Sequence, residues 1–293
     1  MSSQEKLYIY GEVLVDHFPD GSQVLGGAPF NVAWHLQAFG QSPQLVSRVG
    51  ADAEGTQVRA AMRDWGLSRH CLQTDAVRPT GRVTVTFQGG EPSYNIVPDC
   101  AYDHIEEVSL PGCKLLYHGT LAARFGTSAE TLRQLRMSAP QSVFVDVNLR
   151  SPWWRRALVK QLLRGADWVK LNSDELALLT DATPSSENAR AFLQHYQLQG
   201  LLVTLGARGA ELFLPNDERL TVAPSLDVKL VDTVGAGDAF TAVILLGLQQ
   251  DWPMPLALER AQQFAAAVVG QRGATVSEPD FYRVFSQNWQ LNG

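Results

Sequence analysis

The sequence predicts an α/β protein in which helices cover both faces of a mostly parallel central sheet. Short apolar, β-branched runs alternate with segments of helical periodicity along most of the 293 residues. One segment breaks this alternation and predicts a β-hairpin, which adds a small β lid. The chain is 45% hydrophobic and 18% charged, which is typical of a globular protein with a sizeable core. We therefore expect a single domain over 1–293, with the lid contributed by about 13–25 and 80–97.

The strand candidates are runs of apolar and β-branched residues, and the helix candidates are segments with apolar residues at helical spacing. The predicted strands are 7–12, 44–49, 115–119, 143–147, 167–171, 200–205 and 210–214. The predicted helices are 28–39, 55–64, 128–138, 153–163, 187–196, 237–250 and 255–270. In a sheet of this kind, ligands collect at the carboxyl ends of the strands.

The hairpin is predicted over 80–97, TGRVTVTFQGGEPSYNIV. Val83, Val85 and Phe87 alternate with polar residues, and the glycine pair 89–90 supplies a turn before a second extended run. A flap beside the strand ends is well placed to close over a ligand and exclude water. A surface hairpin without such a role is the alternative.

Charge and composition argue against several kinds of partner and site. The net charge is −6, the pI is near 5.5 and no basic run stands out, so nucleic acid and an anionic membrane are not expected as partners. Cys71, Cys100 and Cys113 are odd in number and lack CxxC spacing, which favours reduced thiols over a disulfide framework or a zinc site. The N-terminus has no basic segment followed by an apolar one, and the longest apolar stretch is about half of what a membrane span requires. A cytoplasmic protein is expected.

The stretch VDTVGAGDAF, residues 231–240, indicates chemistry with an anion. The small residues Gly235, Ala236 and Gly237 let backbone N–H groups approach a ligand closely. Apolar residues recur at helical spacing after Asp238, so the turn lies at a helix N-terminus, where free N–H groups and the helix dipole favour an anion. The alternative is that the glycines only shape a turn and that Asp238 caps the helix.

Several common motifs of nucleotide-binding enzymes are missing. No GxxxxGK[ST] P-loop occurs, and the HRD and DFG elements of protein kinases are absent. The first strand continues into GEVLVD rather than GxGxxG, which argues against a Rossmann-type dehydrogenase.

DTVGAGDAF closely resembles DTxGAGD, the C-terminal signature of the ribokinase-like (PfkB) carbohydrate kinases, and GGAPFNVAWHLQAFG is similar to their glycine-rich N-terminal signature. Further matching stretches follow in the family's order: RVGADAEG, DVNLR, KLNSDE, VTLGARGA and QRGA. The resemblance implies a ribokinase-like three-layer α/β/α fold. It also implies an ATP-dependent phosphotransferase that acts on an alcohol group of a carbohydrate, with Mg²⁺ and, in many members, a monovalent cation, usually K⁺.

The resemblance assigns the chemistry to the glycine-rich turn. Asp238 is implied as the general base, and the backbone N–H groups of Gly235, Ala236 and Gly237 as the anion hole. An alcohol is a poor nucleophile at neutral pH, so a carboxylate that takes its proton as the new bond forms lowers the barrier.

On the substrate side, the implied contacts are Asp16, Gly26, Gly27, Asn31 and Arg150. A carboxylate such as that of Asp16 can accept hydrogen bonds from two neighbouring hydroxyls, and Asn31 can donate and accept at once. Read without the family, Asp16 is a turn residue and Asn31 a surface polar residue.

On the nucleotide side, the implied contacts are Lys170, Asn172, Glu175, Thr204, Gly206 and Gly209. Asn172 and Glu175 match the family's NxxE motif, which organises magnesium and the phosphates, often through water. Lys170 and Arg150 would add positive charge because no P-loop lysine exists; a surface ion pair is the alternative for each. The positions that match the family's monovalent-cation site are Asp232, Val234, Val268, Gln271, Gly273 and Ser277.

DVNLRSPWW, residues 146–154, and the hairpin are features that fructokinases of this family commonly carry. They imply a free sugar as the acceptor, with conversion of D-fructose to fructose 6-phosphate as the expected reaction. Ribose, 2-keto-3-deoxygluconate and a nucleoside are alternative acceptors. A sugar phosphate would need an extra cationic cluster, for which Arg82, Arg124 and Arg150 are the candidates.

Two alternatives concern activity and assembly. A catalytically silent relative that only binds a sugar is disfavoured because Asp238, Gly235, Gly237, Asn172 and Glu175 are all present. In the family the lid often pairs with the lid of a second subunit, which implies a homodimer. A monomer whose lid folds onto its own core explains the alternating apolar face equally well.

Overall fold

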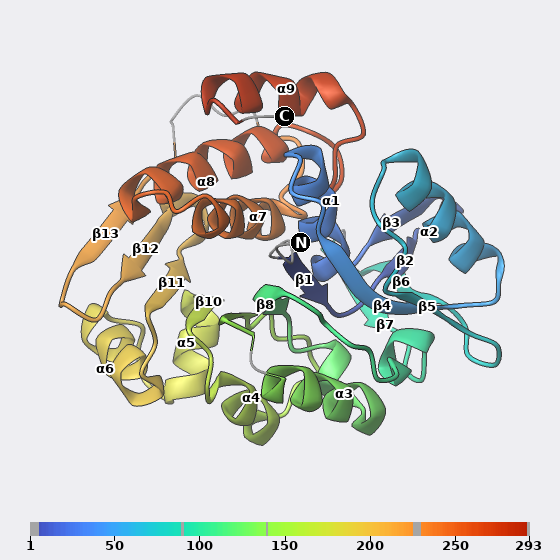
Figure 1. Cartoon of the computed structure of the whole chain (residues 1–293), viewed down its shortest axis with the longest axis horizontal. Helices are drawn as coiled ribbons and strands as arrows, with labels where there is room; N and C mark the ends of the chain where they lie inside the picture. The colour runs from blue at the N-terminus through green and yellow to red at the C-terminus, as the bar shows by residue number, and fades with distance from the viewer. Residues whose placement is uncertain (1–5, 89–90, 139, 225–229, 292–293) are drawn as a thin grey trace.

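The central sheet runs in the order β13-β12-β11-β10-β9-β8-β1-β4-β5 (Figure 1). The computed structural model describes residues 6–88, 91–138, 140–224 and 230–291. The parallel strands are β1 (Lys6–Tyr10), β4 (Gln44–Gly50), β5 (Leu72–Asp75), β8 (Cys113–His118), β9 (Ser142–Asp146), β10 (Trp168–Asn172) and β11 (Gly200–Thr204). β12 (Ala210–Phe213) and β13 (Arg219–Val222) complete one edge as antiparallel strands.

Helices cover both faces of this sheet, as Figure 1 shows. One face is packed by α1 (Ala28–Ala38), α2 (Ala53–Asp64), α7 (Ala236–Gln249), α8 (Met254–Val269) and α9 (Pro279–Asn288), whose buried residues share one apolar cluster. The other face is covered by α3 (Gly126–Met137), α4 (Arg156–Leu163), α5 (Ser173–Thr180) and α6 (Ser186–Tyr196). Short 3₁₀ turns are η1 (Ala101–His104), η2 (Ala122–Arg124) and η3 (Gly206–Arg208). The predicted three-layer fold class is confirmed.

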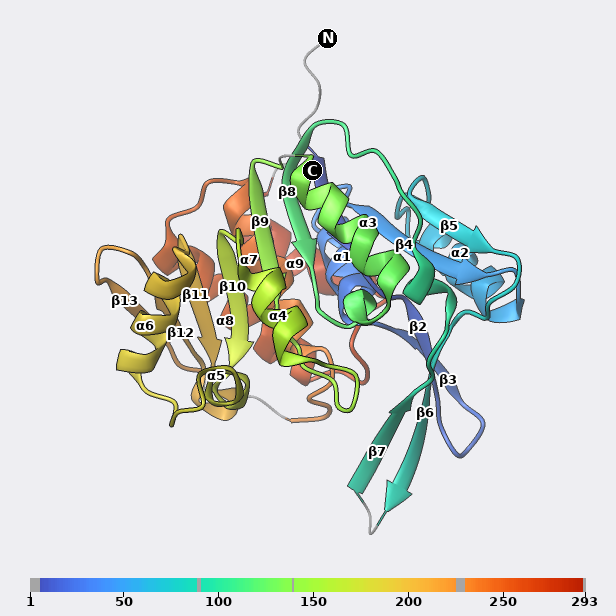
Figure 2. The same ribbon diagram turned by 90° about the horizontal axis from the view of Figure 1, so that it is seen from below.

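A smaller sheet projects from this body, in the order β3-β2-β6-β7 (Figure 2). It consists of β2 (Leu14–His17), β3 (Gln23–Gly26), β6 (Gly81–Gln88) and β7 (Glu91–Ile96). Val83 and Val85 are buried in one apolar cluster with Leu14 and Ile96, so the chain's own core covers this part of the alternating face. The Phe87 side chain and the predicted turn at 89–90 lie outside the described residues.

Several predicted boundaries are wrong, and some elements were not predicted. The first strand ends at Tyr10 instead of residue 12, and the helix expected from residue 153 begins at Arg156. Residues 151–153 form a turn instead, in which the amides of Trp153 and Trp154 donate to the carbonyl oxygen of Arg150. β5, β13, α5 and α9 were not predicted. In the case of α5, β10 runs into the helix without a loop, so no turn residues mark its start.

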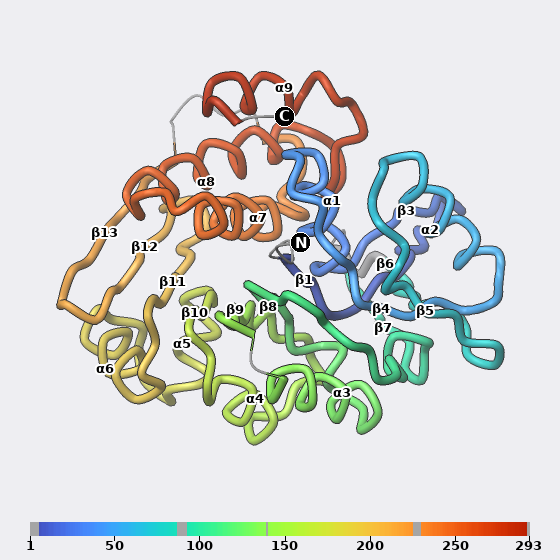
Figure 3. Tube along the Cα trace, in the orientation of Figure 1, coloured from blue at the N-terminus to red at the C-terminus, as the bar shows by residue number. Residues whose placement is uncertain are grey.

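The fold brings the N-terminal part of α1 against the start of α7, although the two segments are about two hundred residues apart in sequence. In the chain trace of Figure 3, α1 and α7 lie side by side on the same face of the sheet. A search of the described residues finds no helix with the length and apolar character needed to cross a bilayer.

The buried side chain of His118, at the end of β8, is expected to make the free energy of unfolding depend on pH. Its side chain is 0% exposed, with Nδ1 2.8 Å from the carbonyl oxygen of Gly119. Burial lowers the pKa of His118 from 6.5 to about 3, so the folded protein holds it neutral. Unfolding therefore takes up a proton below pH 6.5, and this residue's contribution to the free energy of unfolding falls by about 2 kcal/mol between pH 7 and pH 5.

His118→Asn keeps an amide donor near the Gly119 carbonyl but has no proton to take up. In urea unfolding at pH 7 and pH 5, we expect the variant to lose about 2 kcal/mol less stability than the wild type. Equal losses in the two proteins would contradict the buried neutral histidine.

Candidate active site

The glycine-rich turn lies at the N-terminus of α7. Gly235 is the N-cap residue with φ of +79°, and a Cβ at this position would overlap the backbone and side chain of Ala274. Only glycine therefore fits here. The first amides of a helix have no acceptor within the helix, and together with the helix dipole they form a site suited to an anion.

Asp238 occupies the first turn of α7 and points toward α1. Its Oδ2 accepts a hydrogen bond of 2.8 Å from Nδ2 of Asn31, whose side chain is buried. Burial raises the pKa of Asp238 from 3.8 to about 6, although the Asn31 hydrogen bond and the charge of Lys170 act in the opposite direction. The alternatives in which Asp238 only caps the helix and Asn31 is a surface residue do not fit, because Gly235 is the cap and Asn31 is buried.

A buried ion pair lies directly beneath this turn. Nζ of Lys170, on β10, is 2.7 Å from Oδ2 of Asp146, on the neighbouring strand β9. Burial acts to lower the pKa of Lys170, but the charge and hydrogen bond of Asp146, together with the charges of Asp238 and Glu175, raise it overall. The Thr241 hydroxyl lies 3.0 Å from Oδ2 of Asp146 and 2.8 Å from the carbonyl oxygen of Gly237. Lys170 is thus a buried group in an ion pair with Asp146, and the alternative of a surface ion pair is wrong.

The predicted substrate residues come together at one end of the two sheets. Asp16 lies on β2, Gly26 ends the paired strand β3, and Gly27 is the N-cap of α1. A Cβ on Gly26 would lie 3.1 Å from Oδ2 of Asp16, so the missing side chain leaves that carboxylate oxygen accessible. Burial raises the pKa of Asp16 to about 6, and the exposed Arg150 opposes this shift.

Glu12 is a further acidic residue here that the sequence interpretation missed. It is 3% exposed, and its Oε2 has no hydrogen-bond partner among the described residues. Burial raises its pKa to about 7; the positive charge of Arg150 opposes the shift and the negative charge of Asp238 adds to it. The sequence feature that could have identified Glu12 is an acidic residue inside the apolar run YIYGEVLV. Asp146 shows the same feature in VFVDV.

The predicted nucleotide residues meet where β10 and β11 end. Asn172 and Glu175 form a capping box at the start of α5: Glu175 N donates to Oδ1 of Asn172, and Asn172 N donates to Oε2 of Glu175, both at 2.8 Å. Oε1 of Glu175 accepts from Leu149 N at 2.6 Å. Thr204 is the register partner of Asn172. Shortly after it, Gly206 begins η3 and Gly209 is the C-cap of this turn.

The donor set at Asn172 and Glu175 fits magnesium held through water. Both carboxylate oxygens of Glu175 already accept one backbone hydrogen bond, while Asn172 is exposed. One lone pair on each oxygen remains for a water ligand, and Mg²⁺ keeps several waters. The described residues include no cluster of three or more His, Cys, Asp or Glu side chains able to hold a metal directly.

Some of the residues predicted for a monovalent cation also meet. Asp232 Oδ1 accepts from Val234 N and its Oδ2 from Gly273 N, each at 3.0 Å. Val268 is buried, and its carbonyl oxygen accepts from Gln271 N at 2.8 Å. Carboxylate and carbonyl oxygens of this kind suit hard cations. None of the hydrogen bonds found in the described part of the chain ties Ser277 to this group.

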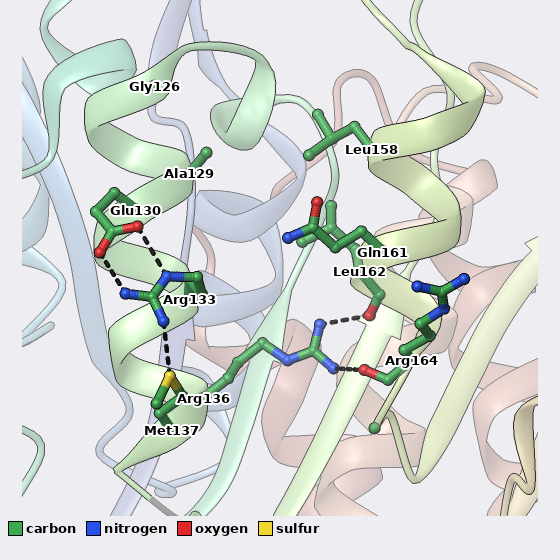
Figure 4. A pocket seen from close by; sticks show the side chains of 11 residues that line it. Gly126, Ala129, Glu130, Arg133, Arg136, Met137, Leu158, Gln161, Leu162 and Arg164 are labelled. Carbon is green, nitrogen blue, oxygen red and sulfur yellow. Dashed lines mark hydrogen bonds and ion pairs between the residues drawn. The ribbon is translucent and has the colours of Figure 1, made fainter.

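A separate groove of about 410 Å³ lies between α3 and α4 (Figure 4). Two arginines that line the groove already have partners there. Arg133 pairs with Glu130, and Arg136 donates to the carbonyl oxygens of Leu162 and Arg164. None of the predicted site residues lines this groove. It is therefore a helix–helix contact with a surface depression and not the active site.

Comparison with known proteins agrees with this geometry. The profile of the pfkB family of carbohydrate kinases matches residues 3–280. Fructokinase from Escherichia coli is 29% identical over 94% of this chain and 96% of its own.

Two solved structures are also similar. A fructokinase double mutant from Vibrio cholerae O395, bound to fructose, ADP and a potassium ion, superposes with a TM-score of 0.83 at 26% identity over 97% of this chain and 99% of that one. Aminoimidazole riboside kinase from Salmonella enterica, complexed with aminoimidazole riboside and an ATP analogue, superposes with a TM-score of 0.80 at 26% identity over 96% and 99% of the two chains.

The glycine-rich turn at the start of α7, the carboxylate beside it and the capping box at the start of α5 thus occur in a chain that matches one family profile over residues 3–280. This chain belongs to the pfkB family of carbohydrate kinases, phosphotransferases whose acceptor is a sugar hydroxyl.

Proposed function

We propose that the protein transfers the γ-phosphoryl group of ATP to D-fructose and forms fructose 6-phosphate. The observation that carries the proposal is the Asp238 carboxylate, held by Asn31 at the mouth of the α7 turn. The fructokinase relatives support fructose as the acceptor. Mg²⁺, a K⁺ ion at the Asp232 loop, a cytoplasmic location and a homodimer through the lid stay predictions.

In the proposed reaction, Asp238 accepts the proton of the attacking sugar hydroxyl as the new O–P bond forms and the bond to the ADP oxygen breaks. Its half-buried position keeps the carboxylate basic, which favours proton transfer near neutral pH. The amides at the start of α7 would stabilise the charge on the migrating phosphoryl group. The positive charge of Lys170, beneath the turn, is balanced by Asp146, so this pair would support the turn from below and add little net charge.

On the nucleotide side, Asn172 and Thr204 would contact the ATP phosphates at the ends of neighbouring strands. Asn172 and Glu175 would hold magnesium through water, and the bound ion would supply charge neutralisation for the phosphates. Because Glu175 also ties Leu149 to α5, the nucleotide end and the segment that leads to Arg150 share one buried carboxylate.

The charges around the site favour a neutral acceptor over a sugar phosphate. Arg82 pairs with Glu54 at 2.6 Å, and Arg124 forms a buried bidentate pair with Asp103 at 2.7 and 2.9 Å. Of the three arginines considered for a phosphate cluster, only Arg150 makes no ion pair among the described residues. A single unpaired arginine can orient a hydroxyl but does not supply the paired cations that a phosphate prefers.

A substrate panel tests the acceptor. We expect ADP release with ATP to be fastest with D-fructose and slow with ribose, 2-keto-3-deoxygluconate, aminoimidazole riboside and fructose 6-phosphate. Faster turnover of another member of the panel would replace fructose and keep the enzyme class. No turnover of any sugar or nucleoside would favour the silent relative.

Asp238→Asn tests the general base. The amide keeps the shape and the contact with Asn31 but cannot accept the proton, so kcat should fall by about 10²–10⁴-fold. The affinity for ATP, measured by calorimetry, should change little because the base does not hold the nucleotide. Asp64→Asn, on the exposed end of α2, is the matched control and should retain wild-type kcat. Retained activity in Asp238→Asn would remove the assigned base.

The raised pKa of Asp238 predicts a pH profile. The base acts only when ionised, so kcat/KM should fall as pH drops through about 6. Asn31→Ala removes a hydrogen bond that favours the ionised form, so the acidic limb should move to higher pH. Because Asp16 titrates in the same region, Asp16→Asn serves as the control and should leave the limb in place. An unmoved limb in Asn31→Ala would show that another group controls the profile.

A further inference from the structure

His35 is a fully buried histidine of α1, and both of its ring nitrogens have a polar partner. Nδ1 lies 2.9 Å from the Tyr282 hydroxyl of α9, and Nε2 lies 3.1 Å from the carbonyl oxygen of Ala274. The neighbouring Trp34 donates from Nε1 to the carbonyl oxygen of Val276 at 2.9 Å. Two adjacent side chains of α1 therefore hold two carbonyl groups of the same loop.

The partners of His35 determine its tautomer. A carbonyl oxygen can only accept, so Nε2 carries the hydrogen and donates to Ala274. Nδ1 is then an acceptor for the Tyr282 hydroxyl, whose single hydrogen is shared between Nδ1 and the carbonyl oxygen of Val276, 3.1 Å away. Burial lowers the pKa of His35 to about 4, which agrees with a neutral ring. The donor to Ala274 is thus a fixed, buried group and not one that water replaces.

The loop that His35 holds supports the glycine-rich turn. Gly235 is in such close contact with Ala274 that a Cβ on the glycine would overlap it. A second tie comes from Asp232, which precedes the turn and accepts from Gly273 N at 3.0 Å. A shift of Ala274 would therefore displace Gly235 and the first amides of α7.

The same face of α1 reaches the base. Asn31 and His35 are four residues apart, so they lie one above the other on the helix, and Asn31 binds Asp238. We propose that His35 is a positioning residue, which through Ala274 fixes the turn amides relative to the Asp238 carboxylate. This inference rests on the proposed function of the turn, and His35 itself touches neither substrate nor nucleotide.

Three substitutions test this role. His35→Phe keeps the ring but loses the donor, and His35→Asn is too short to reach Ala274. His35→Gln places an amide nitrogen near the position of Nε2. Because the turn acts on the migrating phosphoryl group, we expect His35→Phe and His35→Asn to lower kcat by about tenfold or more, with KM for sugar and ATP within about twofold. His35→Gln should stay within about threefold of wild-type kcat.

Amide hydrogen exchange provides a readout that does not depend on activity. We expect faster exchange at residues 234–238 and 271–276 in His35→Phe and His35→Asn, with α6 unchanged. Leu193→Ala, in the buried face of α6, is the control for general destabilisation and should leave kcat at the wild-type value. If His35→Phe does not fold, the comparison of His35→Gln with His35→Asn decides the question.

The proposal is overturned if the loss variants keep wild-type kcat and exchange, if His35→Gln loses as much kcat as His35→Asn, or if Leu193→Ala reproduces the loss of kcat. Faster exchange at the turn with unchanged kcat would have a different meaning. It would show that His35 positions the turn and that the turn is not the anion hole, so the proposed function and not this inference would fail.

Discussion

The hydrogen bond between Asn31 and Asp238 joins two helices that are distant in the chain, and the geometry of the candidate site depends on it. α1 follows directly from the small sheet that carries Asp16, whereas α7 begins with the glycine-rich turn. Their contact brings the segment proposed to bind the substrate close to a helix terminus suited to an anion. The apolar cluster shared by α1, α7 and α8 fixes this contact, because closely packed cores allow little sliding.

Part of the free-energy cost of burying charged groups in the site is offset by neighbouring groups of opposite charge and by hydrogen bonds. Asp146 and Lys170 neutralise each other below the turn, and Thr241 satisfies a further contact of Asp146. Among the described residues, Glu12 and Asp238 form no such ion pair, and burial raises the pKa of both. These two carboxylates are therefore more basic than usual, and acids perturbed in this way are candidates for a functional site.

The α/β architecture and most of the site were predictable because both are encoded in local patterns. Alternating apolar runs predicted the parallel strands, and GAGD before an apolar helix predicted the turn. What could not be predicted depends on tertiary contacts. The local sequence does not show that His35 lies beside Ala274 or that Lys170 pairs with Asp146. It also does not show that Glu175 of the NxxE motif accepts a hydrogen bond from the Leu149 amide. α5 was missed because its start coincides with the end of β10, where no turn separates the two elements.

The small sheet has a mechanical consequence for an acceptor held between Asp16 and Asp238. Asp16 belongs to β2, which pairs with β6 of the hairpin, while Asp238 belongs to the main body. The hairpin is anchored to the start of α2 by Asp52, which accepts from Thr80, and by Glu54, which pairs with Arg82. Under the proposed function, a bound sugar would lie between the small sheet and the main body, and the contacts with α2 would limit how far the hairpin can tilt relative to Asp238.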